Sequence, residues 1–234
     1  MIVAIMQPTY LPWAGYFNLV ARADCFVFLN DAQYEKGSWH NRNRVLVAGN
    51  PHWLTVPIRH GELTKTIAQT YVDDSRGWRS KQLRLIEHNY GRHPHAADLA
   101  PLLAIIGETS FDRLADLNVA LIKSALTALG IGTETVCSSE LGIPGFRTER
   151  LIAILSRLGA KRYLSPRGAA GYLAADQFTE RTSIALEFQR YEPQPYTQWR
   201  QSRYESHLSI LDVVANLGWR KAAAYITDEY STSP

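Results

Sequence analysis

Two short apolar runs near the start of the chain constrain its fold more than any other feature. Ile2–Met6 and Cys25–Leu29 contain no charged or strongly polar side chain, which is typical of strands that are covered on both faces in a parallel sheet. Between these runs, apolar residues recur at the i, i+3, i+4 and i+7 spacing of one helical face: Tyr16, Leu19, Val20 and Ala23. A strand, a helix and a second strand predict a right-handed parallel unit.

The rest of the chain repeats this alternation of helix, glycine and strand. Helical patterns cover residues 78–90, 98–106, 111–129, 147–158 and 208–217, and strand patterns cover 133–137 and 162–165. Residues 45–47 and 53–58 are typical of two strands joined across Gly49-Asn50, a pair compatible with a tight hairpin. These patterns predict a three-layer α/β fold. We expect one domain over residues 1–234, with a small β insertion at 45–72 and a helical lobe at 76–130.

The charge balance and the cysteine count exclude several classes of protein. The chain has 25 Lys and Arg and 22 Asp and Glu residues, a net charge of +3 without a basic block, which disfavours dedicated duplex-DNA binding but not a phosphate-bearing ligand. No apolar stretch reaches the roughly 18 residues of a membrane span, and the first residues lack the basic segment of a secretory signal. We therefore expect a cytoplasmic protein in which Cys25 and Cys137 are reduced thiols.

The first candidate for chemistry is Gln7–Phe17, a polar and aromatic segment that follows the first predicted strand. Ligands bind at this position in open α/β sheets, because backbone N–H groups and the helix dipole favour anions there. The segment resembles the strand–loop–helix opening of nucleotidylyltransferases, with Trp13-Ala14-Gly15-Tyr16 in the place of their His-x-Gly-His element. Both histidines are absent here. The alternative is a tight turn packed by its prolines and aromatic side chains.

The second candidate, Asp31–Arg44, directly follows the second predicted strand and is rich in Trp, His, Asn and Arg. Asp31 is a candidate general base. Lys36 and Arg42 are candidates to bind a phosphate or carboxylate, and Asn41 and Asn43 are candidates to bind polar edges of a ligand. Because neighbouring parallel strands end at the same edge of a sheet, we expect this segment and the first to line one pocket. The alternative is a solvated loop with its usual charges.

The third candidate, Tyr163–Tyr172, combines the end of a predicted strand with a turn of small residues and the start of a helix. Such a turn lets backbone amides approach a phosphate, with Ser165, Arg167 and Gly168 as further partners. An ordinary turn explains the pattern equally well. The seven histidines show no metal-ligand spacing, and no Gly-x-Ser-x-Gly elbow indicates a serine nucleophile.

Five segments resemble the WbqC-like protein family in order and approximate spacing, and together they span nearly the whole chain: QPTYLPWAGYF, FVFLNDAQYEKGSWHNRNRV, SSELG, LGAKRYLSPRGAAGYL and HLSILDVV. The resemblance implies a bacterial protein, often encoded near genes for O-antigen and other surface polysaccharides, that modifies or transfers an activated sugar or acyl group. The chain departs from the family pattern at Asn30-Asp31, where an acidic pair is common, and at Glu205-Ser206-His207, where an apolar residue and a proline are common.

The resemblances imply a nucleotidylyltransferase-like parallel sheet and a transferase that acts on a nucleotide-activated sugar or related activated metabolite in surface polysaccharide biosynthesis. Asp31 and Lys36 are the expected catalytic residues. The expected substrate-binding residues are Gln7, Tyr10, Gly15, Tyr16, Tyr34, Trp39, Asn41, Arg42, Asn43, Ser165, Arg167 and Gly168. The expected partner is a phosphorylated or nucleotide-linked small molecule, and the sequence identifies no cofactor and no metal site. Two alternatives stay open: a non-catalytic protein that binds a nucleotide sugar or a partner enzyme, and an RNA-binding module that uses the aromatic, basic loop.

Overall fold

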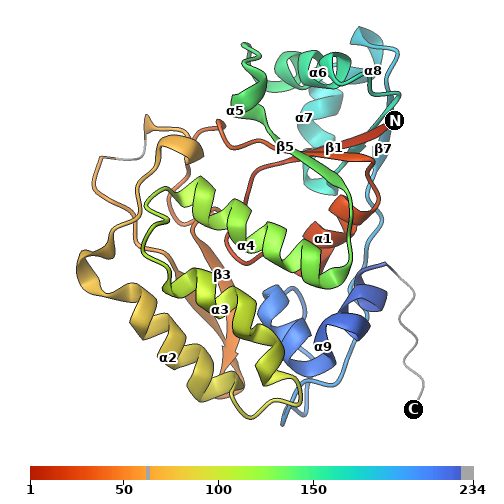
Figure 1. Ribbon diagram of the computed structural model, residues 1–234. Coiled ribbons are helices and arrows are strands. Elements are labelled where there is room, and N and C mark those ends of the chain that lie inside the picture. Colours follow the sequence, from red (N-terminus) through yellow and green to blue (C-terminus); the bar gives the residue numbers. More distant parts are fainter. Residues whose placement is uncertain (62–63, 228–234) are drawn as a thin grey trace.

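A computed structural model describes residues 1–61 and 64–227 of the chain. These residues contain a central sheet of five parallel strands in the order β5-β2-β1-β6-β7 (Figure 1). The strands of this sheet are β1 (Ile2–Met6), β2 (Cys25–Phe28), β5 (Glu134–Cys137), β6 (Arg162–Ser165) and β7 (Ala185–Phe188). The helices are α1 (Ala14–Ala21), α2 (Trp78–Tyr90), α3 (Ala100–Gly107), α4 (Leu114–Leu129), α5 (Ser138–Leu141), α6 (Arg147–Arg157), α7 (Ala170–Ala175), α8 (Phe178–Arg181) and α9 (Ile210–Ile226).

The order of the strands reverses between β1 and β6, which lie side by side in the sheet. β2 and β5 extend the sheet beyond β1, whereas β7 extends it beyond β6. The register pairs Ala4 of β1 with Phe26 on one side and with Leu164 on the other. The loops that follow β1 and β6 diverge toward opposite faces of the sheet. Such a reversal opens a crevice at the carboxyl ends of the two strands, where ligands bind in open α/β sheets.

Alternate residues of β1 point into two different cores. Ala4 packs in a core that it shares with α1, α4 and α9. Val3 and Ile5 pack in the other core, together with side chains of α6, α7 and α8. Figure 1 shows the two groups of helices on opposite sides of the sheet. The predicted three-layer α/β fold is therefore confirmed, and it follows from the period-two alternation of side chains along a buried strand.

β3 (Arg42–Val47) and β4 (Asn50–Thr55) form an antiparallel hairpin outside the main sheet. Its turn consists of Ala48 and Gly49, whose φ angles are 47° and 81°, as a two-residue hairpin turn requires. The turn predicted at Gly49-Asn50 is thus displaced by one residue, because Asn50 pairs with Val47 in the ladder. α2 lies beside this hairpin: the backbone N–H of Leu46 donates to the hydroxyl of Tyr90 at 2.8 Å, and Nε2 of Gln82 donates to the carbonyl of Thr55 at 2.8 Å.

The last helix is longer than predicted. The sequence pattern ends at Leu217, whereas α9 continues to Ile226 across a break at Gly218, where φ is 72° and ψ is 163°. A Cβ atom at Gly218 would lie 2.7 Å from Nδ1 of His95, so glycine permits this close approach. The glycine interrupts the pattern, and the buried side chain of Tyr225 holds the second part of the helix in place. The pattern also misses the single-turn helices α5 and α8, which are too short to show a helical period, and β7, whose apolar run is interrupted by Glu187.

The two cysteines are not bonded to each other. Cys25 and Cys137 are both free thiols, and the β2–β5 register pairs Cys25 with Glu134 and Cys137 with Phe28. They therefore lie at opposite ends of this strand pair, too far along the ladder for a disulfide. Over the described part of the chain, no helix has both the length and the apolar character that a membrane crossing needs.

Candidate functional site

A cavity of about 1070 Å³ opens where β1, β2 and β6 end. We call it the sheet-edge cavity. It lies on the face of the sheet that is covered by α6 and α7. Its lining comes from these two helices, from the ends of the three strands and from the segment around Lys65. Its lining includes Gln7, Asp31, Lys65, Phe146, Arg147, Arg150, Tyr163 and Tyr172.

Asp31 and Arg150 form an ion pair in the wall of this cavity. Asp31 follows β2, and Arg150 lies near the start of α6. Nη2 of Arg150 donates a hydrogen bond to Oδ2 of Asp31, and Oγ of Ser138 donates to Oδ1. Nε of Arg150 donates to the carbonyl of Ile143 at 2.9 Å. The guanidinium is thereby held in one orientation by a carboxylate and a backbone group, as charge-assisted hydrogen bonds permit.

Asn30 connects the end of β2 to the first turn of α5. Its Oδ1 accepts a hydrogen bond from the backbone N–H of Ser139 at 3.1 Å, and its Nδ2 donates to Oγ of Ser139 at 2.9 Å. The neighbouring Ser138 contacts Asp31. The segment that begins with two serines after β5 therefore fixes the position of Asp31, and with it the position of Arg150.

The segment that leads into α6 has an unusual backbone. Gly145 has φ of 113° and Arg147 has φ of 49°, a left-handed conformation that costs a residue with a Cβ atom about 1 kcal/mol or more. Phe146 lies between them and is 86% exposed. Nη2 of Arg147 contacts Oδ1 of Asp176 at 3.0 Å, and Oγ1 of Thr148 donates to Oδ2 of Asp176 at 2.8 Å. These contacts hold the start of α6 against the end of α7.

The charges around the sheet-edge cavity favour an anionic ligand. Among its described lining residues, Lys65, Arg147 and Arg150 are cationic, and Asp31 supplies the one carboxylate. α6 begins at the cavity, so the positive end of its dipole adds to the cationic side chains. Within residues 1–61 and 64–227, no group of three or more His, Cys, Asp or Glu residues could hold a metal ion. The arrangement is chemically that of an anion site built from arginine and lysine.

Two tyrosines form an aromatic part of the wall. Burial raises the pKa of Tyr163 and of Tyr172 above the ordinary value, because a phenolate would lose its hydration there. Both phenols are therefore protonated at neutral pH. The two side chains are joined by a hydrogen bond, and Tyr172 is 37% exposed.

The predicted site residues fall into three environments. Gln7 and Asp31 line the sheet-edge cavity, whereas Gly15, Tyr16 and Arg167 line a second cavity of about 260 Å³, and Gly168 lines both. Five predicted residues are buried outside these cavities: Tyr10, Tyr34, Asn41, Asn43 and Ser165. Three others lie in the loop before β3 or at its start and line neither cavity: Lys36, Trp39 and Arg42. The structure thus brings together only part of the set that was expected in one pocket.

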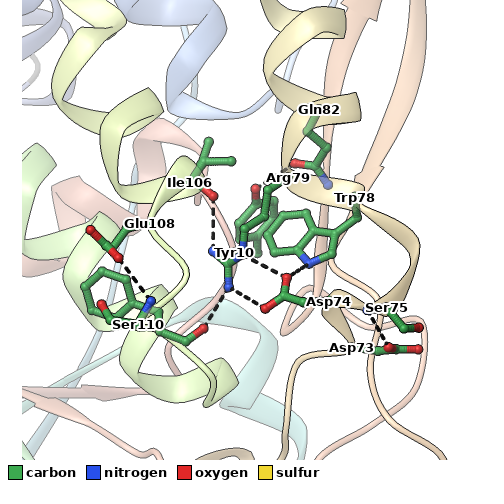
Figure 2. Close-up of polar contacts among 11 residues, drawn as sticks. Tyr10, Asp73, Asp74, Ser75, Trp78, Arg79, Gln82, Ile106, Glu108 and Ser110 are labelled. Atoms are coloured by element: carbon green, nitrogen blue, oxygen red, sulfur yellow. Dashed lines mark hydrogen bonds and ion pairs between the residues drawn. The ribbon is translucent and has the colours of Figure 1, made fainter.

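Tyr10 supports the loop that follows β1 from inside the protein. Its side chain is fully buried, and its hydroxyl donates to Oε1 of Gln82 on α2 at 2.7 Å; Figure 2 shows the two side chains near each other. Nδ2 of Asn43 donates to the carbonyls of Tyr10 and Leu11 at 3.1 and 2.8 Å. Nδ2 of Asn41 donates to a backbone carbonyl just after β4 at 2.9 Å. These side chains join the loop to the hairpin and to α2, a role that polarity alone does not distinguish from ligand binding.

Arg42 stacks on the hairpin instead of reaching the sheet edge. Its guanidinium carbon lies 4.2 Å from the ring centroid of Trp53, a cation–π arrangement. The ring of Trp53 lies 5.3 Å from that of Trp39, and both indoles are partly exposed. Gln7 lines the sheet-edge cavity, whereas Arg42 does not. Arg42 begins β3, a strand of the separate two-stranded sheet.

The sequence analysis missed all three cationic side chains that line the sheet-edge cavity. Arg147 and Arg150 belong to a helix that was predicted, and their position at its start, after two glycines in a short loop, was the available signal. Lys65 lies in a segment without any pattern, so no signal could have placed it. The general rule that cations near a helix start can join an anion site would have identified the two arginines.

Comparison with known proteins identifies the family. The model of the WbqC-like protein family matches residues 7–224, and the chain belongs to that family. The chain is also 33% identical, over 220 residues, to the uncharacterized protein Rv1507c of Mycobacterium tuberculosis (strain ATCC 25618 / H37Rv), an alignment that covers 92% of this chain and 94% of that protein. No solved structure matches the chain.

Proposed function

We propose that the protein is a transferase that acts on a nucleotide-activated sugar or related activated metabolite in surface polysaccharide (O-antigen) biosynthesis. The sheet-edge cavity would bind the phosphate-bearing donor, in the cytoplasm. The observation that carries this proposal is Arg150, oriented by Asp31 at the start of α6, where side chains and helix dipole both favour an anion. The polysaccharide context rests on membership in the WbqC-like family.

The proposed roles follow from position in the cavity. Arg150, Arg147 and Lys65 neutralise the phosphates of the donor, and Tyr172 donates a hydrogen bond to its oxygens. Gln7, at the end of β1, binds a polar edge of the ligand. A volume of about 1070 Å³ supports a ligand of nucleotide-sugar size, since cavities of roughly 300–1,000 Å³ hold drug-sized molecules.

One observation favours a second candidate, a protein that binds the same ligand without catalysis. Both carboxylate oxygens of Asp31 already accept hydrogen bonds, from Arg150 and from Ser138. A carboxylate held between a guanidinium and a hydroxyl orients the guanidinium, which is a role that does not need proton transfer. Lys36, the other expected catalytic residue, is exposed and lines neither cavity. In this reading Asp31 is a positioning residue for Arg150.

A ligand screen followed by a turnover assay tests the proposal and separates the two candidates. Thermal unfolding is measured with a panel of nucleotides and nucleotide sugars, and a ligand at 100 times its dissociation constant is expected to stabilise the fold by about 2.7 kcal/mol. Ligands that stabilise the protein are then incubated with it and with candidate acceptor glycans. Release of the nucleotide with transfer of the sugar supports the transferase. Stabilisation without transfer supports the binding protein, and a panel without effect contradicts both.

A further inference from the structure

The second cavity adjoins the sheet-edge cavity and has no role in donor binding as proposed above. Its volume is about 260 Å³. Met6, Pro166 and Gly168 line both cavities, which therefore meet at the carboxyl ends of β1 and β6. The remaining side chains that matter for its chemistry are Trp13, Arg167, Gln189, Tyr191, Glu192 and His207. We call it the indole cavity, after Trp13.

Three aromatic rings form one wall of the indole cavity. The ring of Trp13 lies 4.7 Å from that of His207 and 5.7 Å from that of Tyr191. A Cβ atom at position 15 would lie 2.2 Å from the Trp13 indole, so Gly15 allows the indole to rest on the first turn of α1. The wall is therefore fixed by close packing on the helix, and its rings offer a rigid apolar surface.

The polar side of the indole cavity carries a donor and an acceptor without net charge. Nη1 of Arg167 lies 2.8 Å from Oε1 of Glu192, and the two side chains are 60% and 66% exposed. Nε of Arg167 also donates to the carbonyl of Gln189 at 3.1 Å, while Nε2 of Gln189 donates to the carbonyl of Gly15 at 2.7 Å. Guanidinium and carboxylate are thus presented together, beside the aromatic wall.

This chemistry selects against a phosphate and in favour of a polyol. Glu192 would repel an anion and balances the charge of Arg167. The sheet-edge cavity differs, because three cationic side chains and one carboxylate line it. Adjacent hydroxyl groups both donate and accept, so a paired guanidinium and carboxylate satisfy them together. The C–H groups of a sugar ring pack on aromatic side chains. At roughly 30 Å³ per water molecule, the cavity holds about nine waters, which is room for one monosaccharide ring.

We propose that the indole cavity binds a single uncharged pyranose unit. Because it shares the residues at the ends of β1 and β6 with the sheet-edge cavity, the sugar would be that of the acceptor glycan, lying next to the activated donor. The acceptor role rests on the proposed function. Binding of the sugar rests only on the indole cavity, so it can be tested by itself.

The test uses protein labelled with ¹⁵N at its six tryptophan indoles. Methyl glycosides of glucose, galactose, mannose and N-acetylglucosamine are titrated, and the Trp13 signal is assigned by its loss in Trp13→Phe or, if that variant does not fold, in Trp13→Tyr. We expect at least one glycoside to shift the Trp13 signal while the signals of Trp39 and Trp53 stay in place. Glu192→Gln is expected to weaken this binding about tenfold, because it removes a charged acceptor.

Two controls make the outcomes decisive. Glu180→Gln changes an exposed carboxylate on α8 that lines neither cavity, and it is expected to leave glycoside binding unchanged. Arg150→Gln changes the proposed donor site in the sheet-edge cavity and is also expected to leave glycoside binding unchanged. Glycoside binding therefore tests the indole cavity separately from the donor site. The inference is overturned if no glycoside moves the Trp13 signal, if Glu192→Gln binds as tightly as the parent, or if inorganic phosphate moves the signal and the glycosides do not.

Discussion

Arg150 donates a hydrogen bond to Asp31 although 119 positions separate the two residues in the sequence. The contact joins the end of β2 to the start of α6 in the wall of the sheet-edge cavity. Asp31 was expected to act on a substrate directly. Its hydrogen bonds to Arg150 and Ser138 support a second role, in which Asp31 orients the guanidinium of Arg150.

A double-mutant cycle on Asp31 and Arg150 tests this coupling. Asp31→Asn and Arg150→Gln each leave a partly buried partner unpaired, since their side chains are only 23% and 15% exposed. We expect each single change to lower the free energy of unfolding by about 2 kcal/mol, and the double change to cost no more than about one of them. Urea unfolding measures all four proteins. Strictly additive losses would show that the two residues act independently.

Tyr10→Phe distinguishes a structural role from a ligand-binding role. The change leaves Oε1 of the buried Gln82 without its donor, so we expect a loss of about 1–2 kcal/mol in the free energy of unfolding. Affinity for a ligand of the sheet-edge cavity should stay the same, because Tyr10 does not line it. A large loss of affinity without a loss of stability would show that Tyr10 takes part in ligand binding.

Arg79→Lys should be costly although it keeps the charge. Arg79 donates through Nε and Nη2 to Asp74 and through Nη1 to the carbonyl of Ile106, as Figure 2 shows. Its Nη2 also donates to the carbonyl of Phe111 at 2.8 Å. One ammonium group cannot reach all of these acceptors. We expect a loss of about 2–4 kcal/mol in urea unfolding. Arg84→Lys, an exposed change on the same helix, should stay within about 0.5 kcal/mol.

Asp212 predicts a pH dependence of stability. Its carboxylate is fully buried and accepts hydrogen bonds from the hydroxyls of Tyr90 and Tyr196 at 3.0 and 2.6 Å. Burial nevertheless raises its pKa above the ordinary value for an aspartate. The folded state therefore binds more protons than the unfolded state between the two pKa values, and stability falls as the pH rises through that window.

Asp212→Asn removes this titration. We expect the stability advantage of the parent protein over the variant to shrink as the pH rises from 4 to 7, by about 1.4 kcal/mol for each unit by which folding raises the pKa. Urea unfolding at a series of pH values measures the difference. An advantage that grows with pH would mean that the folded protein favours the charged carboxylate.

The fold was predictable because its main elements carry strong local patterns. Continuous apolar runs identified β1 and β2, and the helical period located α2 with its observed bounds. β7 was missed because Glu187 interrupts its short apolar run, and the second part of α9 was missed because Gly218 interrupts the helix. Local pattern is thus sufficient where an element is long or uniformly apolar.

The candidate site was less predictable, because it depends on contacts between distant segments. The sequence placed Gln7 and Asp31 at the sheet edge, where they lie. It could not show that Asn43 binds the backbone at Tyr10, or that Arg150 arrives from a helix far along the chain. Residue type and strand position indicate where a site opens. Which polar side chains face it is decided by tertiary packing.

The measurement that most directly tests anion binding in the sheet-edge cavity is calorimetric titration of the best nucleotide sugar from the screen. It is performed on the parent protein, on Arg150→Gln and on Arg84→Gln, which removes an exposed charge from α2 outside this cavity. Loss of a charge-assisted contact of about 2 kcal/mol predicts about thirtyfold weaker binding for Arg150→Gln and unchanged binding for Arg84→Gln. Equal affinity of the parent and Arg150→Gln would contradict the account.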